Sequence, residues 1–119
     1  MLNYPASVNV YICTKPTDMR KSFDTLAALT RDVLFQNPLS GHIFVFFNKN
    51  RNRVKLLYWD KYGYCIFIKR LEQGRFHIYD WDNVSHSSYI TDPKELTLIL
   101  DGVDLSRARK RKRFSLASA

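Results

Sequence analysis

The chain has 119 residues, of which 45% are apolar and 14% aromatic, and its formal net charge is +8. This length fits one domain with at most a short tail, and the apolar content excludes an intrinsically disordered chain. No apolar run is long enough to span a membrane, and the first residues lack the pattern of a signal peptide, so we expect a cytoplasmic protein. Cys13 and Cys65 lie far apart within apolar runs, which predicts free thiols in a reducing compartment.

The positive charge is concentrated in two segments. Residues 49–75 contain eight basic and two acidic residues, and residues 107–113 contain six basic residues and no acid. The rest of the chain has five basic residues against nine acidic ones. Such an asymmetric distribution favours a polyanionic partner, with nucleic acid as the first candidate and an anionic membrane surface as the second.

The first third of the chain predicts a strand followed by a helix. Residues 8–14 are rich in β-branched and aromatic side chains, as is typical of a short strand. A helix start follows, with Thr17 or Asp18 as the N-cap. Apolar or small residues then recur at intervals of three and four, which predicts one core-facing stripe. The helix should end near Gln36, because the Asn-Pro pair that follows cannot continue it.

Three strands are predicted next, over residues 43–48, 53–59 and 64–71, with polar turns between them. A fourth strand of this group is expected around residues 75–80. In the strand over residues 53–59, side chains alternate between the two faces of the sheet. One face should be core (Val54, Leu56, Tyr58), and the other should be a contact face or half covered (Arg53, Lys55, Leu57, Trp59).

The last third predicts a short helix and a tail. Residues 81–89 are polar and have no clear period, whereas Thr91-Asp92-Pro93 predicts the start of an amphipathic helix over residues 94–100. Residues 107–119 are expected to form a basic tail that is disordered when free. The element order predicts a single α+β domain over residues 1–106. It should contain an antiparallel sheet of about four to five strands, with two helices packed on one face.

The basic segments also contain aromatic residues, a combination that suits nucleic acid. Cations neutralise phosphates while aromatic rings stack on bases, for which Tyr58, Trp59, Tyr62 or Tyr64 are available. A helix N-terminus beside two cations can hold a phosphate. We expect contacts to phosphates and not to base edges. The predicted contact residues are Arg20, Lys21, Lys49, Arg51, Arg53, Lys55, Trp59, Lys69, Arg70, Arg75, Arg107, Arg109, Lys110, Arg111, Lys112 and Arg113.

Each part of this prediction has a structural alternative. Charged residues on strands, lysine above all, prevent edge-to-edge aggregation of sheets. Arg20 can pair with Asp24 on a solvated helix face. The tail can serve to keep the chain soluble.

One cluster has the character of a metal site, namely His77, Asp80, Asp82 and His86. On a continuous strand His77 and Asp80 would face opposite sides, whereas Asp80 and Asp82 would share one. Without a third acid at a matching position, we expect neither a metal site nor a cofactor. The chain also lacks a Ser-His-Asp order and a glycine-rich phosphate loop, so no catalytic residue is predicted and we do not expect an enzyme. The alternative is a magnesium-dependent nuclease that uses Asp80 and Asp82.

Several blocks follow one another in an order that resembles a known family. They are residues 16–22 (PTDMRKS), 55–60 (KLLYWD) followed by Gly63, 69–76 (KRLEQGRF) and 96–105 (LTLILDGVDL). Together they resemble the second-reading-frame accessory proteins of IS-sixty-six-type insertion sequences, often called TnpB. The resemblance covers about residues 10–105 and excludes the tail. One departure is Thr25, which stands where the family usually has a glycine.

The resemblance implies a small bacterial protein needed for transposition, beside a separate DDE-type transposase and a further small partner. With the charge distribution, it leads us to predict a non-enzymatic accessory protein that binds DNA at transposon ends through the strand region and the tail. The alternative is an adaptor that docks the transposase, with incidental DNA contact. Its docking face would be aromatic (Phe44, Phe46, Trp59 and Phe67). Neither interpretation involves a membrane.

Overall fold

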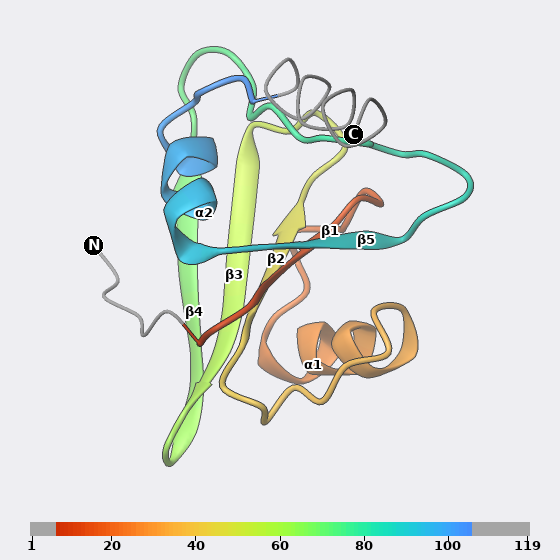
Figure 1. The fold of residues 1–119 in the computed structure, drawn as a ribbon, viewed down its shortest axis with the longest axis vertical. Coiled ribbons are helices and arrows are strands. Elements are labelled where there is room, and N and C mark those ends of the chain that lie inside the picture. The colour runs from red at the N-terminus through yellow and green to blue at the C-terminus, as the bar shows by residue number, and fades with distance from the viewer. Residues whose placement is uncertain (1–6, 106–119) are drawn as a thin grey trace, which may run out of the picture.

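The computed structural model describes residues 7–105, and the predicted tail lies outside this range. Five strands form one sheet in the order β4-β3-β2-β1-β5, with two helices beside it (Figure 1). The predicted α+β class is confirmed. The elements in chain order are β1 (Val10–Cys13), α1 (Phe23–Asp32), β2 (Ile43–Phe47), β3 (Arg53–Asp60), β4 (Gly63–Arg70), β5 (Ser88–Thr91) and α2 (Pro93–Leu100). Among the described residues, neither helix has the length and apolar character needed to cross a membrane.

The sheet is mixed, whereas the sequence predicted an antiparallel one. β1 runs parallel to β2, with Val10 opposite Ile43, and antiparallel to β5. Parallel neighbours need a long crossover connection, and the segment between β1 and β2 provides one through α1. β2, β3 and β4 are joined by short turns and pair in antiparallel fashion, as predicted.

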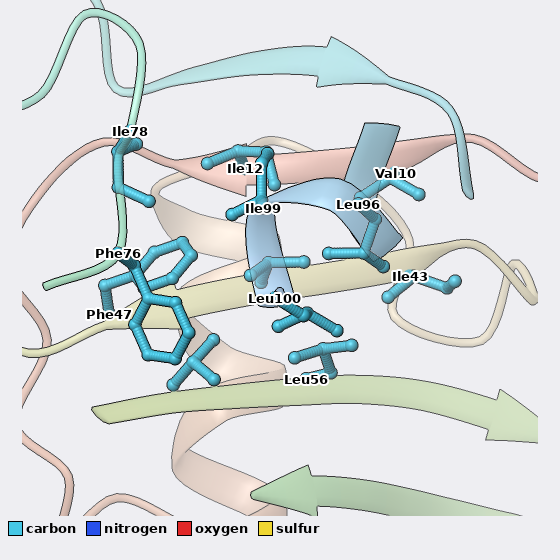
Figure 2. Packing of buried hydrophobic residues seen from close by; sticks show 12 residues of the cluster. Val10, Ile12, Ile43, Phe47, Leu56, Phe76, Ile78, Leu96, Ile99 and Leu100 are labelled. Carbon is cyan, nitrogen blue, oxygen red and sulfur yellow. The ribbon is translucent and has the colours of Figure 1, made fainter. Parts of the chain in front are cut away.

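The two helices cover opposite faces of the sheet, so the prediction of both helices on one face is wrong. Figure 2 shows the core under α2, where Leu96, Ile99 and Leu100 pack against alternate residues of β1, β2 and β3. The core under α1 contains Leu26 and Ala27 together with the other alternate residues of these strands. The reason is β2, whose five residues (IFVFF) are all buried. A strand that is apolar on both sides must be covered on both sides. We call the two sides the α1 face and the α2 face.

α1 begins later than predicted and ends earlier. Its N-cap is Ser22, whose backbone N–H donates to Thr25 Oγ1 at 2.8 Å. Thr25 therefore contributes to the cap at the position where it departs from the family glycine. The predicted cap Asp18 accepts from the backbone N–H of Arg20 instead, in the loop before the helix. The helix ends at Asp32, and Phe35, with φ of 54°, turns the chain before residue 36.

The predicted strand at residues 75–80 does not form. Phe76 and Ile78 are buried against α2 in irregular backbone, and Asp80 has φ of 58°, which a strand does not permit. β5 forms further along the chain and pairs with β1 over four residues. A four-residue edge strand is too short to produce a clear apolar period, so sequence analysis did not detect it. The second helix starts as predicted, because Asp92 accepts from the Glu95 N–H at 2.7 Å.

Replacing Phe47 should measure how strongly the α2 face depends on its aromatic core. The side chain is fully buried, with ring centroids 5.5 Å from Phe76 and 6.4 Å from Trp81. We expect Phe47→Ala to lower the free energy of unfolding by about 3–5 kcal/mol, because it leaves a cavity. The matched control is Phe35→Ala, at a side chain that is 81% exposed. It should change stability by less than about 0.5 kcal/mol. Urea unfolding measures both, and equal effects would contradict the described core.

Candidate nucleic-acid interface

The β3–β4 hairpin sorts the predicted contact residues between the two faces. Its strands pair over their full length, with Arg53 opposite Arg70 and Trp59 opposite Tyr64. Residues opposite one another point to the same face, and successive residues alternate. Leu57 packs under α1, which shows which set of hairpin side chains lies on the α1 face. The α1 face of the hairpin therefore carries Arg53, Lys55, Leu57, Trp59, Tyr64, Ile66, Ile68 and Arg70.

A cluster of cations lies on this face at the end of the hairpin away from its turn. Arg53 and Arg70 are exposed there. The partly buried Lys55 ammonium donates to the backbone oxygen of Lys21 at 2.7 Å. This hydrogen bond holds the loop before α1, which carries Arg20 and Lys21, against the same surface. We call these five residues (Arg20, Lys21, Arg53, Lys55 and Arg70) the α1-face basic patch.

Arg20 and Lys21 reach the patch from a loop, because they precede the Ser22 N-cap. The sequence placed them in the first helical turn, where cations oppose the helix dipole. Arg20 pairs with Asp18 through Nη2 and Oδ2 at 2.7 Å, and not with the predicted Asp24. The hydrogen bonds that Arg20 donates from its side chain and backbone lower the pKa of Asp18 to about 2, and the same pairing raises the pKa of Arg20.

Arg70 also has an acidic partner, since its Nη2 lies 3.0 Å from Glu72 Oε1. Both side chains of this pair are well exposed, as is the side chain of Arg20. Exposed ion pairs contribute little to stability because water and salt screen them. Both arginines can therefore exchange a carboxylate for a phosphate at low cost.

Two predicted contact residues lie on the α2 side instead. Lys69 is opposite Val54, and its ammonium donates to the Leu100 backbone oxygen at 2.7 Å. A cation at the end of a helix satisfies a free carbonyl and complements the helix dipole. Arg51 places its guanidinium carbon 5.7 Å from the centroid of the Trp81 ring, which packs against the α2-face core. The sheet separates both cations from the α1-face basic patch.

The remaining predicted residues lie at the rim or near the hairpin turn. Lys49 and Arg75 are exposed in neighbouring turns, which a hydrogen bond from Phe76 N–H to Arg51 O joins at 2.6 Å. Trp59 packs edge-on against Tyr64, with ring centroids 5.1 Å apart. The predicted contact residues from Arg107 to Arg113 lie outside the described residues.

The aromatic docking face of the adaptor interpretation does not form. Phe44 and Phe46 are fully buried in the core under α1. Phe67 is half-buried on the α2 face, so it lies on the opposite side from Trp59. Of the rings that the sequence offered for stacking, Tyr62 is 94% exposed; Phe35, which the sequence placed within the predicted helix and not at a contact surface, is 81% exposed. Tyr62 is exposed because it lies in the β3–β4 turn, and Phe35 is exposed at an αL position after α1. Neither feature produces a periodic pattern in the sequence.

The four candidate metal ligands belong to three different close pairs, two of which include a residue outside the predicted cluster. His86 Nε2 is 4.0 Å from Asp80 Oδ2, and His77 Nδ1 is 4.0 Å from Asp104 Oδ2. Asp82 instead lies 3.8 Å from the Lys15 ammonium. Within residues 7–105, no three His, Cys, Asp or Glu side chains are arranged to hold a metal ion. Asp80 and Asp82 thus lie beside different partners, His86 and Lys15.

Both described cysteines are free thiols, as predicted. Cys13 lies in the core under α1, and its burial raises the pKa of the thiol. Because the thiolate is the reactive form, Cys13 is unsuited to nucleophilic or redox chemistry.

These features define a small α+β protein with a mixed sheet between two helices and a basic patch on one face. The chain belongs to the IS66 Orf2-like family of transposition accessory proteins, whose family model matches residues 8–110. This confirms the predicted resemblance.

Two relatives come from Sinorhizobium fredii (strain NBRC 101917 / NGR234). Uncharacterized protein y4hO is 38% identical over 104 residues, which cover 87% of this chain and 88% of the relative. Uncharacterized protein y4jC is 30% identical over 111 residues, which cover 93% and 92%. No solved structure matches the chain significantly.

The Asp18 carboxyl gives a direct test of the loop that carries Arg20. In the intact protein we expect its pKa at about 2, and Arg20→Ala should return it toward 3.8. Because the folded-state pKa is lowered, the pairing stabilises the protein above the ordinary pKa. That contribution should be lost as the pH falls from about 4 to about 2. NMR titration of the carboxyl carbons measures the pKa. Asp24→Asn is the control and should leave the pKa of Asp18 unchanged. If Asp24→Asn shifted that pKa and Arg20→Ala did not, the Arg20–Asp18 pairing would be wrong.

Lys69 should matter for stability and not for nucleic-acid binding. Lys69→Met keeps the aliphatic stem and removes the bond to Leu100 O, so we expect a loss of about 1 kcal/mol in unfolding free energy. Lys49→Met removes an exposed charge and should change stability by less than about 0.5 kcal/mol. Thermal unfolding compares the two variants. If they were equally stable, the capping role of Lys69 would be wrong.

Proposed function

We propose that this protein is a non-enzymatic accessory protein of transposition that binds DNA at the ends of its element, with the α1-face basic patch as the phosphate-binding surface. The observation that carries the proposal is the convergence of five cations from three segments on one face. The Lys55–Lys21 hydrogen bond and the pairing of Arg53 with Arg70 support this convergence.

The charge arrangement favours a polyanion over a purely structural role. Arg53 and Arg70 are directly opposite one another, and like charges at such positions oppose strand pairing. Bound phosphate would remove this repulsion. If all five cations released counterions on duplex DNA, log affinity would fall with log salt concentration with a slope magnitude of about 4.5.

Protection of a sheet edge explains only part of the patch. β4 is an edge strand, so Arg70 can serve to block pairing with another sheet. β3 lies between β2 and β4, and its edges are both paired. Lys55 anchors the loop before α1 through Lys21 O. Arg53 therefore needs another explanation, which phosphate contact provides.

The family indicates the setting of this binding. The protein would act in the cytoplasm beside the DDE-type transposase and further transposition proteins of the same element, and its contacts to phosphates would steady them on the DNA. Lys49 and Arg75 at the rim, and the basic residues 107–113, would add sequence-independent affinity.

A second candidate function, docking of a partner protein, is favoured by one observation. Phe35 is 81% exposed and adopts φ of 54°, a conformation that an aromatic residue rarely occupies. Leu39 in the same connection is 51% exposed. These two side chains, and not the predicted aromatic face, would anchor such a partner.

Binding to element-end DNA across a salt series tests the main proposal. Arg53→Gln with Arg70→Gln should lower the slope magnitude by about 2, because two phosphate contacts are lost. Folding stability should be unchanged or slightly higher, since the repulsion between the two arginines is removed. Lys94→Gln, at an exposed position of α2, is the single-charge control and should leave the slope nearly unchanged.

A variant ending at Ser106 separates the patch from the basic tail. We expect it to keep salt-sensitive binding to which Arg53 and Arg70 still contribute. Wild-type protein without salt-sensitive binding near physiological ionic strength would overturn the proposal and favour the docking function.

A further inference from the structure

The turn of the β3–β4 hairpin projects from the body of the molecule. The strands pair as far as Asp60 and Gly63, so Lys61 and Tyr62 alone form the turn. In Figure 1 this turn extends past both helices and the other strands, at the lower end of the view. Eight cross-strand residue pairs support it, and Trp59 packs on Tyr64 directly behind it. The turn is thus a small tip on a stiff support.

The side chains at this tip contribute little to the fold. Tyr62 is 94% exposed, so its ring is almost fully solvated. Lys61 is exposed as well. Other tyrosines near the hairpin, such as Tyr64 and Tyr58, pack against a core. An aromatic ring that gains no burial is well placed to contact something outside the protein.

The backbone of the turn supports the same conclusion. Lys61 has φ of 45°, whereas neither Tyr62 nor Gly63 has a positive φ. Tyr62 N–H donates to Asp60 O, so the tip contains a γ-turn centred on Lys61, and glycine adopts such a positive φ most readily. The chain has lysine there, at a cost to the backbone, and its glycine two positions later. Strained backbone positions of this kind cluster at ligand-binding and active sites.

We propose that this tip contacts an unpaired base, with Tyr62 stacking on the base and Lys61 binding the adjacent phosphate. Stacking of bases on aromatic rings, with cations along the backbone, is how proteins hold single-stranded nucleic acid. A paired and stacked base offers no face to an inserted ring, so the tip selects DNA with unpaired nucleotides. This inference rests on the proposed function, because it assumes that the protein binds DNA.

The distance between the tip and the α1-face basic patch sets the form of the preferred DNA. From Arg53 to Asp60 the strand spans seven residue steps, about 23 Å at 3.3 Å per residue. This length corresponds to about seven nucleotides at 3.4 Å each. The patch can therefore hold duplex phosphates while the tip reaches a base about seven positions away. The preferred substrate is a duplex that is interrupted or frayed at this distance.

The test compares two probes with the full-length protein. One is a 20-base-pair duplex, and the other is the same duplex with three unpaired nucleotides that include 2-aminopurine. We expect the wild type to bind the interrupted probe roughly tenfold more tightly, which matches the usual strength of one stacked base. The fluorescence of 2-aminopurine should be quenched on binding. Equal affinity for both probes, without quenching, would overturn the inference.

Variants at the tip separate stacking from folding. Tyr62→Ser should abolish both the preference and the quenching while it keeps salt-sensitive duplex binding, and Tyr62→Trp should retain both. Lys61→Gly should raise the melting temperature, because glycine suits the turn, yet weaken binding to the interrupted probe severalfold. Full preference in Tyr62→Ser, or unchanged binding in a stabilised Lys61→Gly, would overturn the inference.

The patch variant distinguishes this inference from the proposed function. Arg53→Gln with Arg70→Gln should weaken binding to both probes by a similar factor and leave their ratio unchanged. If the wild type bound neither probe, the proposed function and this inference would both be wrong. If it bound both equally, only the inference would fail.

Discussion

The complete burial of β2 is the constraint on which the rest of the structure depends. Its sequence IFVFF has no polar side, so both faces of the sheet need a cover at this strand. α1 covers one face and α2 the other. The crossover that brings α1 to its face also makes β1 parallel to β2, which yields a mixed sheet. One strand thus determines both the layering and the topology.

The same constraint decides where a partner can reach the sheet. The β3–β4 hairpin forms one margin of the sheet (Figure 1), and several of its side chains stay exposed beside the helices. Under α1, Leu57 is buried, while Arg53 and Arg70 lie beyond the helix and stay exposed. Alternation along β3 and β4 then separates cations that adjoin in sequence. Arg70 remains on the accessible face, and Lys69 turns to α2, where it caps the helix.

The sequence predicted those elements whose signals are local. Alternating side chains and turn residues predicted the strands of the hairpin, and the Thr91-Asp92-Pro93 sequence predicted the Asp92 cap. Both form where expected. The side to which each helix packs depends on the pairing of distant strands, which local patterns do not encode. The same holds for the candidate site. Composition revealed the basic character of residues 49–75, but Arg51 and Lys69 proved to be anchored on the α2 side only once the register was known.

The β3–β4 hairpin contains two unfavourable local choices. Arg53 faces Arg70 across the strands, and Lys61 occupies a turn position that suits glycine. Sequences that fold well satisfy local preferences, and departures from them mark places where another requirement applies. One partner would explain both features, since a polyanion would neutralise Arg53 and Arg70 and would bind the exposed Lys61. Under the proposed function, the two ends of the hairpin would be parts of one extended surface for DNA, built on a strand pair whose central portion packs against the core.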